Sequence, residues 1–230
     1  MCGISGIVGS AYFKAEEIIA MNSAIRHRGP DDEGFLLIDA ERNLHIAGGT
    51  DTPSGTWSSN FAYAPDARIQ ELSNSQLRMA LGHRRLSILD LSEAGHQPMS
   101  YSDGRYWIAF NGEIYNYLDI KSELQKTGRQ FITRTDTEVI LAAYAEWGEK
   151  CLEKFAGMWA FAIYDNTLRE IFLARDRYGI KPLYYWFAPD GRFCFGSEIK
   201  QFSSCNGWNA EMNPERVYDY LAYSFTDHTD

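Results

Sequence analysis

The sequence predicts an α+β protein whose sheets are covered on both faces, and three observations support this fold class. Strand-length apolar segments alternate with a few helical segments along the chain. Residues 157–165 and 192–199 are apolar or aromatic on both faces, as in a sheet packed on two sides, one of them by a second sheet. Residues 136–155 have an apolar face at helical spacing.

Length, composition and charge narrow the class of protein. The chain has 230 residues, 45% hydrophobic and 23% charged, which is enough to bury a sizeable core, and we expect one domain over 1–230. The net charge of −9, without a cluster of Lys or Arg, argues against nucleic acid or an anionic membrane as partner. The sequence has no secretory signal pattern and no stretch of about 18 apolar residues. We therefore expect a cytoplasmic protein with a small-molecule substrate.

The first half of the chain is predicted to be mainly strand. Residues 39–80, rich in Gly, Ser, Asn and Pro, are expected to form an elaborated surface loop or hairpin. The other elements are a strand at 3–9, a helix from about 13 to 26, strands at 34–39, 44–48, 81–90 and 106–114, and a helix at 115–128 that ends on Gly128 as its C′ residue.

The second half holds the clearest helix, predicted over 136–155 after a short strand at 130–135. Its apolar residues are three and four apart, and Thr135 with Glu138 fits a capping box. A last helix runs from Pro214 to about Tyr223, with Asn213 before it. Four strands lie between the two helices, at 157–165, 170–176, 182–187 and 192–199.

The cysteines and histidines give no sign of a disulfide scaffold or a metal site. The four cysteines form no C-x-x-C pair, and the five histidines show no metal-ligand spacing. We expect all the cysteines to be reduced.

Cys2 directly follows the initiator methionine. If Met1 is excised, as a small second residue permits, Cys2 carries an α-amino group with a pKa of about 7.7–8.0. This amine can take the thiol proton, directly or through a water, and return it to a leaving group, so that one residue supplies nucleophile and base. The alternative is an ordinary small, buried cysteine.

Such a nucleophile requires an oxyanion hole. Asn111, at the end of an apolar strand, and Gly112 after it can direct a side-chain NH₂ and a backbone N–H at one point. A strand-end Asn-Gly turn has the same letters without a function. Glu113 follows in an apolar context, where a merely solvated role is less natural.

Charged residues in two other segments are candidates for substrate binding. By strand alternation, only one of Arg84 and Arg85 shares a face with Leu89. That guanidinium either binds a carboxylate in a covered site or forms a surface ion pair. Asp136 starts the long helix, where a carboxylate ordinarily complements the helix dipole or caps the helix.

Together these candidates describe one site, with a nucleophile and its own base, an oxyanion hole, a guanidinium for a carboxylate and acids for an ammonium group. An amino acid with a side-chain amide has all the matching features. Glutamine fits.

The sequence also resembles the N-terminal glutaminase domain of the asparagine synthetase family, a class II glutamine amidotransferase. The resemblance covers about residues 2–203 and implies an N-terminal-nucleophile hydrolase fold, a four-layer αββα sandwich with two antiparallel sheets between helical layers. The motifs that carry it are, in order, "MCGISGIVG", "RHRGPDDEG", "LGHRRLSILDLSEAGHQPM", "FNGEIYNY", "TRTDTEVIL", "FAGMWAFAIYD", "ARDRYGIKPLYY" and "FGSEIK".

The resemblance implies a role for each candidate residue. These roles are Cys2 as nucleophile, Arg85 as the partner of the substrate carboxylate, Leu86 and Ile88 as pocket lining, Asn111 and Gly112 as oxyanion hole, and Glu113 and Asp136 as partners of the substrate amine.

The expected reaction is hydrolysis of L-glutamine to glutamate and ammonia through a Cys2 thioester, with no cofactor in this domain. By the resemblance, a synthetase domain or subunit receives the ammonia for an ATP-dependent amidation like that of asparagine synthetase, and ATP and Mg are expected only there. Residues 204–230 are expected to form a C-terminal helical segment leading toward that domain, which this chain lacks. Residues 39–78 are longer than the usual link in the family. A homodimer is left open.

Two other functions are weighed against this one. The first is a catalytically silent glutamine-sensing or scaffold domain that docks a synthetase, which retention of Met1 would favour. The second is a related hydrolase acting on another amide, which gives no reason for Arg85, Glu113 and Asp136 to occur together.

Overall fold

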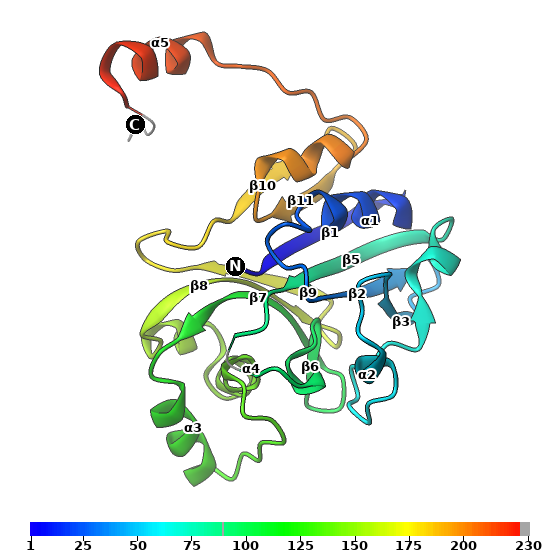
Figure 1. The fold of residues 1–230 in the computed structure, drawn as a ribbon, viewed down its shortest axis with the longest axis vertical. Helices are drawn as coiled ribbons and strands as arrows, with labels where there is room; N and C mark the ends of the chain where they lie inside the picture. The colour runs from blue at the N-terminus through cyan, green and yellow to red at the C-terminus, as the bar shows by residue number, and fades with distance from the viewer. Residues whose placement is uncertain (89, 226–230) are drawn as a thin grey trace.

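The computed structural model describes residues 1–88 and 90–225. Leu89, the reference for the alternation of Arg84 and Arg85, lies outside the described residues, as does the 226–230 end of the C-terminal segment. Figure 1 shows two stacked sheets with helices on their outer sides and one helix standing apart from the rest.

The larger sheet has seven strands in the order β10-β11-β1-β5-β2-β3-β4. Neighbouring strands are antiparallel except at one edge, where β3 and β4 pair in parallel and Ala47 lies opposite Ala67. The antiparallel sheet expected from the sequence is thus present, with one short parallel pair at this edge. The strands are β1 (Gly3–Lys14), β2 (Asp32–Asp39), β3 (Leu44–Gly48), β4 (Ala67–Arg68), β5 (Gln76–Arg85), β10 (Tyr184–Phe187) and β11 (Arg192–Gly196).

The smaller sheet has four antiparallel strands in the order β6-β7-β8-β9. The β7–β8 ladder is unbroken from Tyr106 opposite Asp165 to Ile114 opposite Gly157, so it holds Asn111 and Gly112 in a regular strand. The strands are β6 (Met99–Tyr101), β7 (Tyr106–Ile114), β8 (Gly157–Asp165) and β9 (Glu170–Arg175).

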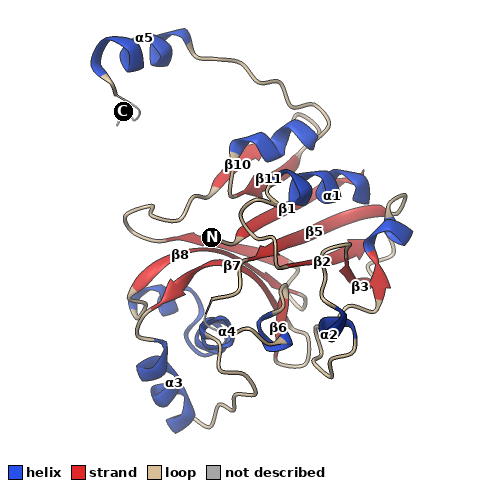
Figure 2. Ribbon diagram, in the orientation of Figure 1, coloured by secondary structure: helices blue, strands red, loops and turns tan. Residues whose placement is uncertain are grey.

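Helices cover the outer face of each sheet (Figure 2), and the predicted four-layer αββα sandwich is confirmed. The larger sheet is covered by α1 (Ala15–Ala24) and the 3₁₀ helix η4 (Ile199–Ser204). The smaller sheet is covered by α4 (Asp136–Trp147), with α3 (Tyr117–Lys126) and the 3₁₀ helix η3 (Gly148–Glu153) packed beside it. The remaining elements are α2 (Ser54–Trp57), η1 (Ile69–Leu72), η2 (Glu93–Gly95) and α5 (Pro214–Tyr223).

Strand alternation explains why β2 is apolar on both faces. Phe35 and Leu37 pack with Ile18 of α1 in one buried cluster, whereas Leu36 and Ile38 belong to the cluster between the sheets. Burying such side chains contributes about 1.5–3 kcal/mol each. The sequence therefore specifies a middle layer of the sandwich.

The predicted strand at 130–135 is wrong because a side chain takes its backbone donors. The Glu138 carboxylate accepts hydrogen bonds from the backbone N–H groups of Ile132 at 2.9 Å and Thr133 at 2.7 Å. The Thr135 hydroxyl accepts from the Glu138 N–H at 3.3 Å, which is half of the predicted capping box. Glu138 does not return the bond, because its carboxylate is bound to the preceding loop.

Several predicted boundaries also move, and the largest shifts are at three elements. The helix predicted to reach residue 155 ends as α4 at Trp147, because Gly148 adopts a φ of +58° and the chain continues as a 3₁₀ helix. The strand predicted at 81–90 starts earlier and ends at Arg85. The first strand extends to Lys14 and displaces the start of the following helix.

Residues 39–80, predicted as an elaborated surface loop or hairpin, also contribute to the larger sheet and to the buried core. They contain β3 and β4, which extend the larger sheet, and the short helices α2 and η1. Tyr63 and Ile69 from this segment are buried, Tyr63 in the same cluster as Leu36 and Ile38.

Helix α5 forms where the sequence predicts it. The Asn213 side chain accepts hydrogen bonds from the N–H groups of Glu215 and Arg216, and Pro214 is the first helical residue. None of its residues is buried. None of the helices in the described part of the chain is long and apolar enough to cross a membrane.

Candidate active site

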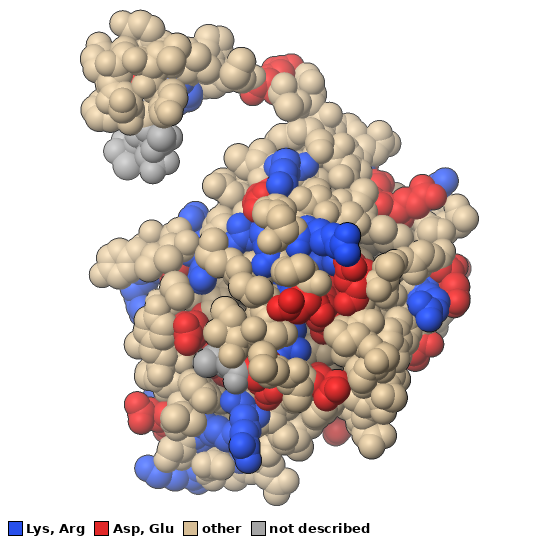
Figure 3. Space-filling view, viewed as in Figure 1, with Lys and Arg blue, Asp and Glu red and all other residues tan. Residues whose placement is uncertain are grey.

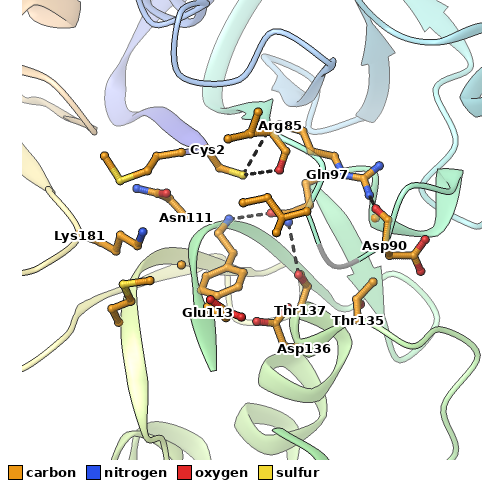
Figure 4. A pocket seen from close by; sticks show the side chains of 17 residues that line it. Cys2, Arg85, Asp90, Gln97, Asn111, Glu113, Thr135, Asp136, Thr137 and Lys181 are labelled. Atoms are coloured by element: carbon orange, nitrogen blue, oxygen red, sulfur yellow. Dashed lines mark hydrogen bonds between the residues drawn. The ribbon is translucent and has the colours of Figure 1, made fainter. Parts of the chain in front are cut away.

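A pocket of about 120 Å³ lies where the start of β1 meets the end of β7. It is lined by all the residues that the sequence analysis proposed for the site, which are Cys2, Arg85, Leu86, Ile88, Asn111, Gly112, Glu113 and Asp136. In the view of Figure 4, Cys2, Asn111 and Lys181 lie on one side, Glu113 and Asp136 on a second, and Arg85 with Asp90 on a third.

Cys2 directly precedes β1 and is held there by its backbone. Its carbonyl accepts a hydrogen bond from Arg28 Nε at 2.9 Å, and the next residue, Gly3, pairs with Arg84 of β5. The Sγ atom lies 3.4 Å from the Leu86 backbone nitrogen and 3.6 Å from the Leu86 carbonyl oxygen. The thiol is thus fixed against the start of the loop that follows β5.

Burial raises the pKa of the Cys2 thiol. The Leu86 N–H, the Arg85 guanidinium and the Lys181 ammonium act in the opposite direction. Because desolvation is the largest effect, the thiol needs a base close by to form the thiolate nucleophile at neutral pH.

Asn111 directs an unused donor into the pocket. Its side chain is 1% exposed, and its Nδ2 atom is buried without a hydrogen-bonding partner in the described structure. A buried donor left unpaired costs about 1–3 kcal/mol, so the fold maintains this group at an energetic cost. An oxyanion formed beside Cys2 would supply the missing partner.

Gly112 is required by the close approach of β8. A Cβ atom at this position would lie 2.3 Å from the Met158 carbonyl oxygen and 2.7 Å from the Trp159 Cα. Backbone atoms cannot give way as a flexible side chain can, so only glycine fits here.

The two arginines at the end of β5 point to opposite faces, as alternation predicts. Arg84 is 3% exposed and pairs with Glu33 at 2.7 Å and Asp51 at 2.6 Å. Arg85 lines the pocket, and its guanidinium donates to the carbonyls of Ser92, at 2.9 Å, and Asp90. Its fork retains further N–H groups for a ligand.

Asp136 is the first residue of α4 but not its cap, because Thr135 accepts the capping hydrogen bond. The Asp136 Oδ2 atom accepts from the Ile114 N–H at 3.0 Å, and the side chain lines the pocket. Burial raises the pKa of Asp136 to about 6, and the nearby Glu113 carboxylate adds to the shift. A cation bound here would oppose both effects.

The two apolar residues of the predicted site differ in exposure. Leu86 is half-buried beside Cys2, whereas Ile88 is 71% exposed and lies at the pocket rim. Leu86 therefore has the closer relation to the thiol, through its backbone N–H and carbonyl.

Sequence reasoning missed several pocket residues. Gln97 supports the wall, because its Oε1 accepts from the Phe110 N–H at 2.7 Å and its Nε2 donates to the Thr137 hydroxyl at 3.4 Å. Lys181 is 7% exposed, at the end of a loop whose N–H groups converge on Asp176. The motif "ARDRYGIKPLYY" was the available signal for Lys181.

The histidines of the conspicuous motifs make protein contacts. His27 Nε2 lies 2.9 Å from Glu198, His83 Nε2 lies 2.9 Å from the Phe110 carbonyl, and His96 Nδ1 lies 2.7 Å from Asp32. Among residues 1–88 and 90–225 there is no group of three or more His, Cys, Asp or Glu side chains that could hold a metal ion.

Comparison with known proteins gives consistent matches. Residues 64–230 match a family described as a glutamine amidotransferase domain. A Methanocaldococcus jannaschii protein named "Putative asparagine synthetase (glutamine-hydrolyzing) 2" is 38% identical over 98% of this chain, which spans 40% of that relative. Asparagine synthetase (glutamine-hydrolyzing) 1 of Bacillus subtilis is 34% identical over 98% of this chain, which spans 30% of that protein.

A solved structure has the same fold. The glutamine phosphoribosylpyrophosphate amidotransferase of B. subtilis superposes with a TM-score of 0.66 at 24% identity, covering 88% of this chain and 43% of that one. The chain described here thus spans less than half of each of these three proteins.

Proposed function

The chain belongs to the glutamine amidotransferase domain family, and from that premise we propose that its Cys2 pocket hydrolyses L-glutamine to L-glutamate and ammonia. The observation that carries the proposal is the buried Asn111 Nδ2, which has no partner in the described structure and lines the same pocket as the Cys2 thiol. A site for acyl transfer needs both a nucleophile and such a donor.

The first step forms a tetrahedral intermediate. After Met1 is removed, the α-amine of Cys2 takes the thiol proton, and the sulfur attacks the side-chain amide carbon of glutamine. A C–S bond forms while the carbonyl π pair moves onto oxygen. Asn111 Nδ2 and the Gly112 N–H donate to this oxyanion. Retention of Met1 would block the step, because an acylated amine is not a base.

The intermediate then collapses, and water completes the reaction. The C–N bond breaks as the Cys2 ammonium returns its proton to the nitrogen, which leaves as ammonia. Water, deprotonated by the same amine, attacks the thioester carbon, and the C–S bond breaks to release glutamate and the thiol. The sum is glutamine plus water giving glutamate plus ammonia.

Recognition of the substrate uses charges at two walls of the pocket. Arg85 binds the α-carboxylate through its planar fork, while Asp136 and Glu113 bind the α-ammonium group. The raised pKa of Asp136 is consistent with this assignment, because a bound ammonium group would stabilise a carboxylate that burial otherwise destabilises.

The use of the ammonia is a separate proposal. Two relatives are named as glutamine-hydrolysing asparagine synthetases, and this chain spans 40% and 30% of their lengths. We propose that ammonia passes to a synthetase domain or subunit for an ATP-dependent amidation, and that ATP and Mg serve only there. The cytoplasmic location stays a prediction, to be checked by cell fractionation, and the homodimer stays open, to be decided by sedimentation.

The test is glutamate release by the 230-residue chain, after intact-mass measurement has shown that Met1 is absent. We expect release from L-glutamine without ATP and in the presence of EDTA. Cys2→Ala should lower turnover by several orders of magnitude, since removal of a nucleophile leaves only binding and oxyanion stabilisation. Cys151→Ala, which removes a buried core thiol, is the matched control and should keep kcat for the folded protein.

Two outcomes would contradict the proposal. Undiminished turnover in Cys2→Ala would exclude Cys2 as the nucleophile. Binding of L-glutamine without hydrolysis, in protein that lacks Met1, would instead identify a silent glutamine-sensing domain.

A further inference from the structure

Arg85 is held in place by the loop formed by residues 90–96, here called the arginine loop. Arg85 Nη1 donates to the Ser92 carbonyl at 2.9 Å, and Nη2 donates to the Asp90 carbonyl. The guanidinium lies so close to Gly95 that a Cβ there would be 2.0 Å from Nη2. The backbone of the loop therefore sets the orientation of the guanidinium.

Tyr63 supports the same loop with a hydrogen bond from the segment 39–80. Its hydroxyl donates to the Ala94 carbonyl at 2.8 Å. The ring is 2% exposed and stacks on Phe61, with a centroid distance of 5.1 Å. Both the hydroxyl and its acceptor are buried, so water cannot readily replace either partner.

Hydrogen bonds at both ends hold the arginine loop. At its start, the Asp90 carboxylate accepts from the Ser92 N–H at 2.8 Å. At its end, His96 Nδ1 lies 2.7 Å from Asp32. The middle of the loop contacts the segment 39–80 twice, through Tyr63 and through Gly55, where a Cβ would lie 2.2 Å from Glu93 Oε1.

We propose that Tyr63 is a positioning residue for the substrate carboxylate, because its hydroxyl fixes the Ala94 carbonyl and thereby the loop that orients Arg85. The inference rests on the proposed function, in which Arg85 binds the α-carboxylate of glutamine. It gives the segment 39–80 a role in substrate recognition.

The physical basis is the geometry of bidentate binding. A guanidinium binds a carboxylate through two parallel N–H donors only when its plane is held in the right orientation. Without the Tyr63 hydroxyl, the buried Ala94 carbonyl loses its partner, and the loop shifts toward another donor at the expense of the Arg85 orientation. The hydrogen bonds that link Tyr63, the arginine loop and Arg85 do not include Cys2 Sγ or Asn111, so we expect the substitution to affect binding and not the chemical step.

The test compares Tyr63→Phe with Tyr164→Phe, which removes the same atom from a buried ring of β8 and is the matched control. The substrates are L-glutamine and 4-aminobutanamide, which lacks only the α-carboxylate. For Tyr63→Phe we expect KM for L-glutamine to rise about 5-fold to 10-fold, as for one weakened hydrogen bond, with kcat changed less than about 2-fold. Its kcat/KM for 4-aminobutanamide should match that of the unsubstituted chain, and Tyr164→Phe should leave both substrates unchanged.

An equilibrium measurement supplies a second readout. In Cys2→Ala protein, which cannot turn over, adding Tyr63→Phe should raise the calorimetric Kd for L-glutamine by the same factor. While both proteins are almost fully folded at the assay temperature, which calorimetric unfolding checks, the apparent Kd equals the intrinsic Kd, so a modest loss of stability cannot imitate this result.

The outcomes separate the two proposals. If the unsubstituted chain is active and Tyr63→Phe leaves KM unchanged, or weakens both substrates equally, the role of Tyr63 is wrong and the proposed function stands. If the chain binds L-glutamine without hydrolysing it, the hydrolytic function is wrong and the Kd values decide the role of Tyr63. A chain that does neither overturns both.

Discussion

Asn111 illustrates at the scale of one residue how the fold prepares a reaction. Its strand position, fixed by pairing with Ala160, keeps the side chain 1% exposed while Nδ2 remains without a partner in the described structure. A donor held in place before the reaction needs no reorganisation when charge develops on the substrate oxygen. In the proposed reaction, this unfavourable burial in the free protein would be converted into stabilisation of the transition state.

We expect Asn111→Ala to lower kcat for L-glutamine by about 10²–10³, the cost of one oxyanion donor, with little change in KM. Steady-state glutamate release measures both constants. The control is Asn116→Ala, which loses hydrogen bonds to Lys154 and Ala156 and should lower the unfolding temperature while keeping kcat. A raised KM at constant kcat in Asn111→Ala would assign Asn111 to ground-state binding.

The sequence predicted the pocket residues that carry a recognisable chemical role. The α-amine pointed to Cys2, strand alternation pointed to one of Arg84 and Arg85, and the family resemblance selected Arg85. Tyr63 could not be found this way, because its segment has weak periodicity and its partner is a backbone carbonyl 31 residues away. Lys181 was missed because no spacing relates its loop to the start of β1.

At the scale of elements, the start of α4 separates two roles that the sequence left combined. Thr135 is the N-cap, so Asp136 is free to face the pocket while it accepts the Ile114 N–H. The raised pKa of Asp136, about 6, indicates that its carboxylate is poorly compensated in the free protein. A helix that needed only the Thr135 cap would not require a buried carboxylate at Asp136 as well.

We expect Asp136→Asn to lower kcat/KM for L-glutamine at neutral pH by an amount equivalent to about 2–5 kcal/mol of binding free energy. The substrate ammonium then loses a desolvated partner. The analogue without the α-amine, 4-carbamoylbutanoate, should be affected far less. Kinetics on both proteins with both substrates form the double-mutant cycle. Equal losses for the two substrates would show that Asp136 acts through the helix alone.

The same residue should govern a pH dependence. In the folded protein the pKa of Asp136 is about 6, against an ordinary value of 3.8, so between these values the folded state binds more protons than the unfolded state. Its contribution to stability therefore falls as pH rises through that window. The KM for L-glutamine should rise as pH falls below about 6, and Asp136→Asn should abolish this limb without lowering the unfolding temperature at neutral pH.

Several elements with strong local signals were predicted to the residue, whereas the end of α4 and the elements that depend on distant partners were not. The ranges of β7, β8 and α5 agree with the sequence patterns. The segment 130–135 has strand-like letters, but the Glu138 carboxylate takes two of its N–H groups. A side chain in the next helix thus overrides the local β preference.

At the scale of the whole molecule, the site exists because two sheets meet. Cys2 precedes the first strand of the larger sheet, whereas Asn111 belongs to the smaller one. Leu36 and Leu81 of the larger sheet belong to one buried cluster with Ala162 of β8, and this packing fixes the separation of the two sheets. No local pattern contains this relation, so the sequence could indicate the site only through complementary chemistry.

Helix α5 lies outside this arrangement. It stands off from the sandwich in Figure 1, and Figure 3 shows that its surface in this view is largely uncharged, whereas acidic and basic groups are interspersed over the body. Tyr218, Tyr220, Leu221 and Tyr223 are all more than half exposed. The last aromatic contact with the body before α5 is made by Trp208, which lies 5.1 Å from Trp186 and 5.2 Å from Phe202 between ring centroids.

Removing every residue after Asn209 should therefore leave both the pocket and the body intact. We expect kcat/KM for L-glutamine to be unchanged and the unfolding temperature to stay within about 2 °C, because no α5 side chain is buried. The control is Trp208→Ala in the full chain, which loses the ring contacts with Trp186 and Phe202. This variant should lower the unfolding temperature by several degrees, because an aromatic pair contributes about 0.5–1.5 kcal/mol beyond its buried area. Calorimetry and glutamate release measure these effects. Loss of hydrolysis on truncation, with an unchanged unfolding temperature, would show that α5 acts on the pocket directly, because the body would have kept its stability without it.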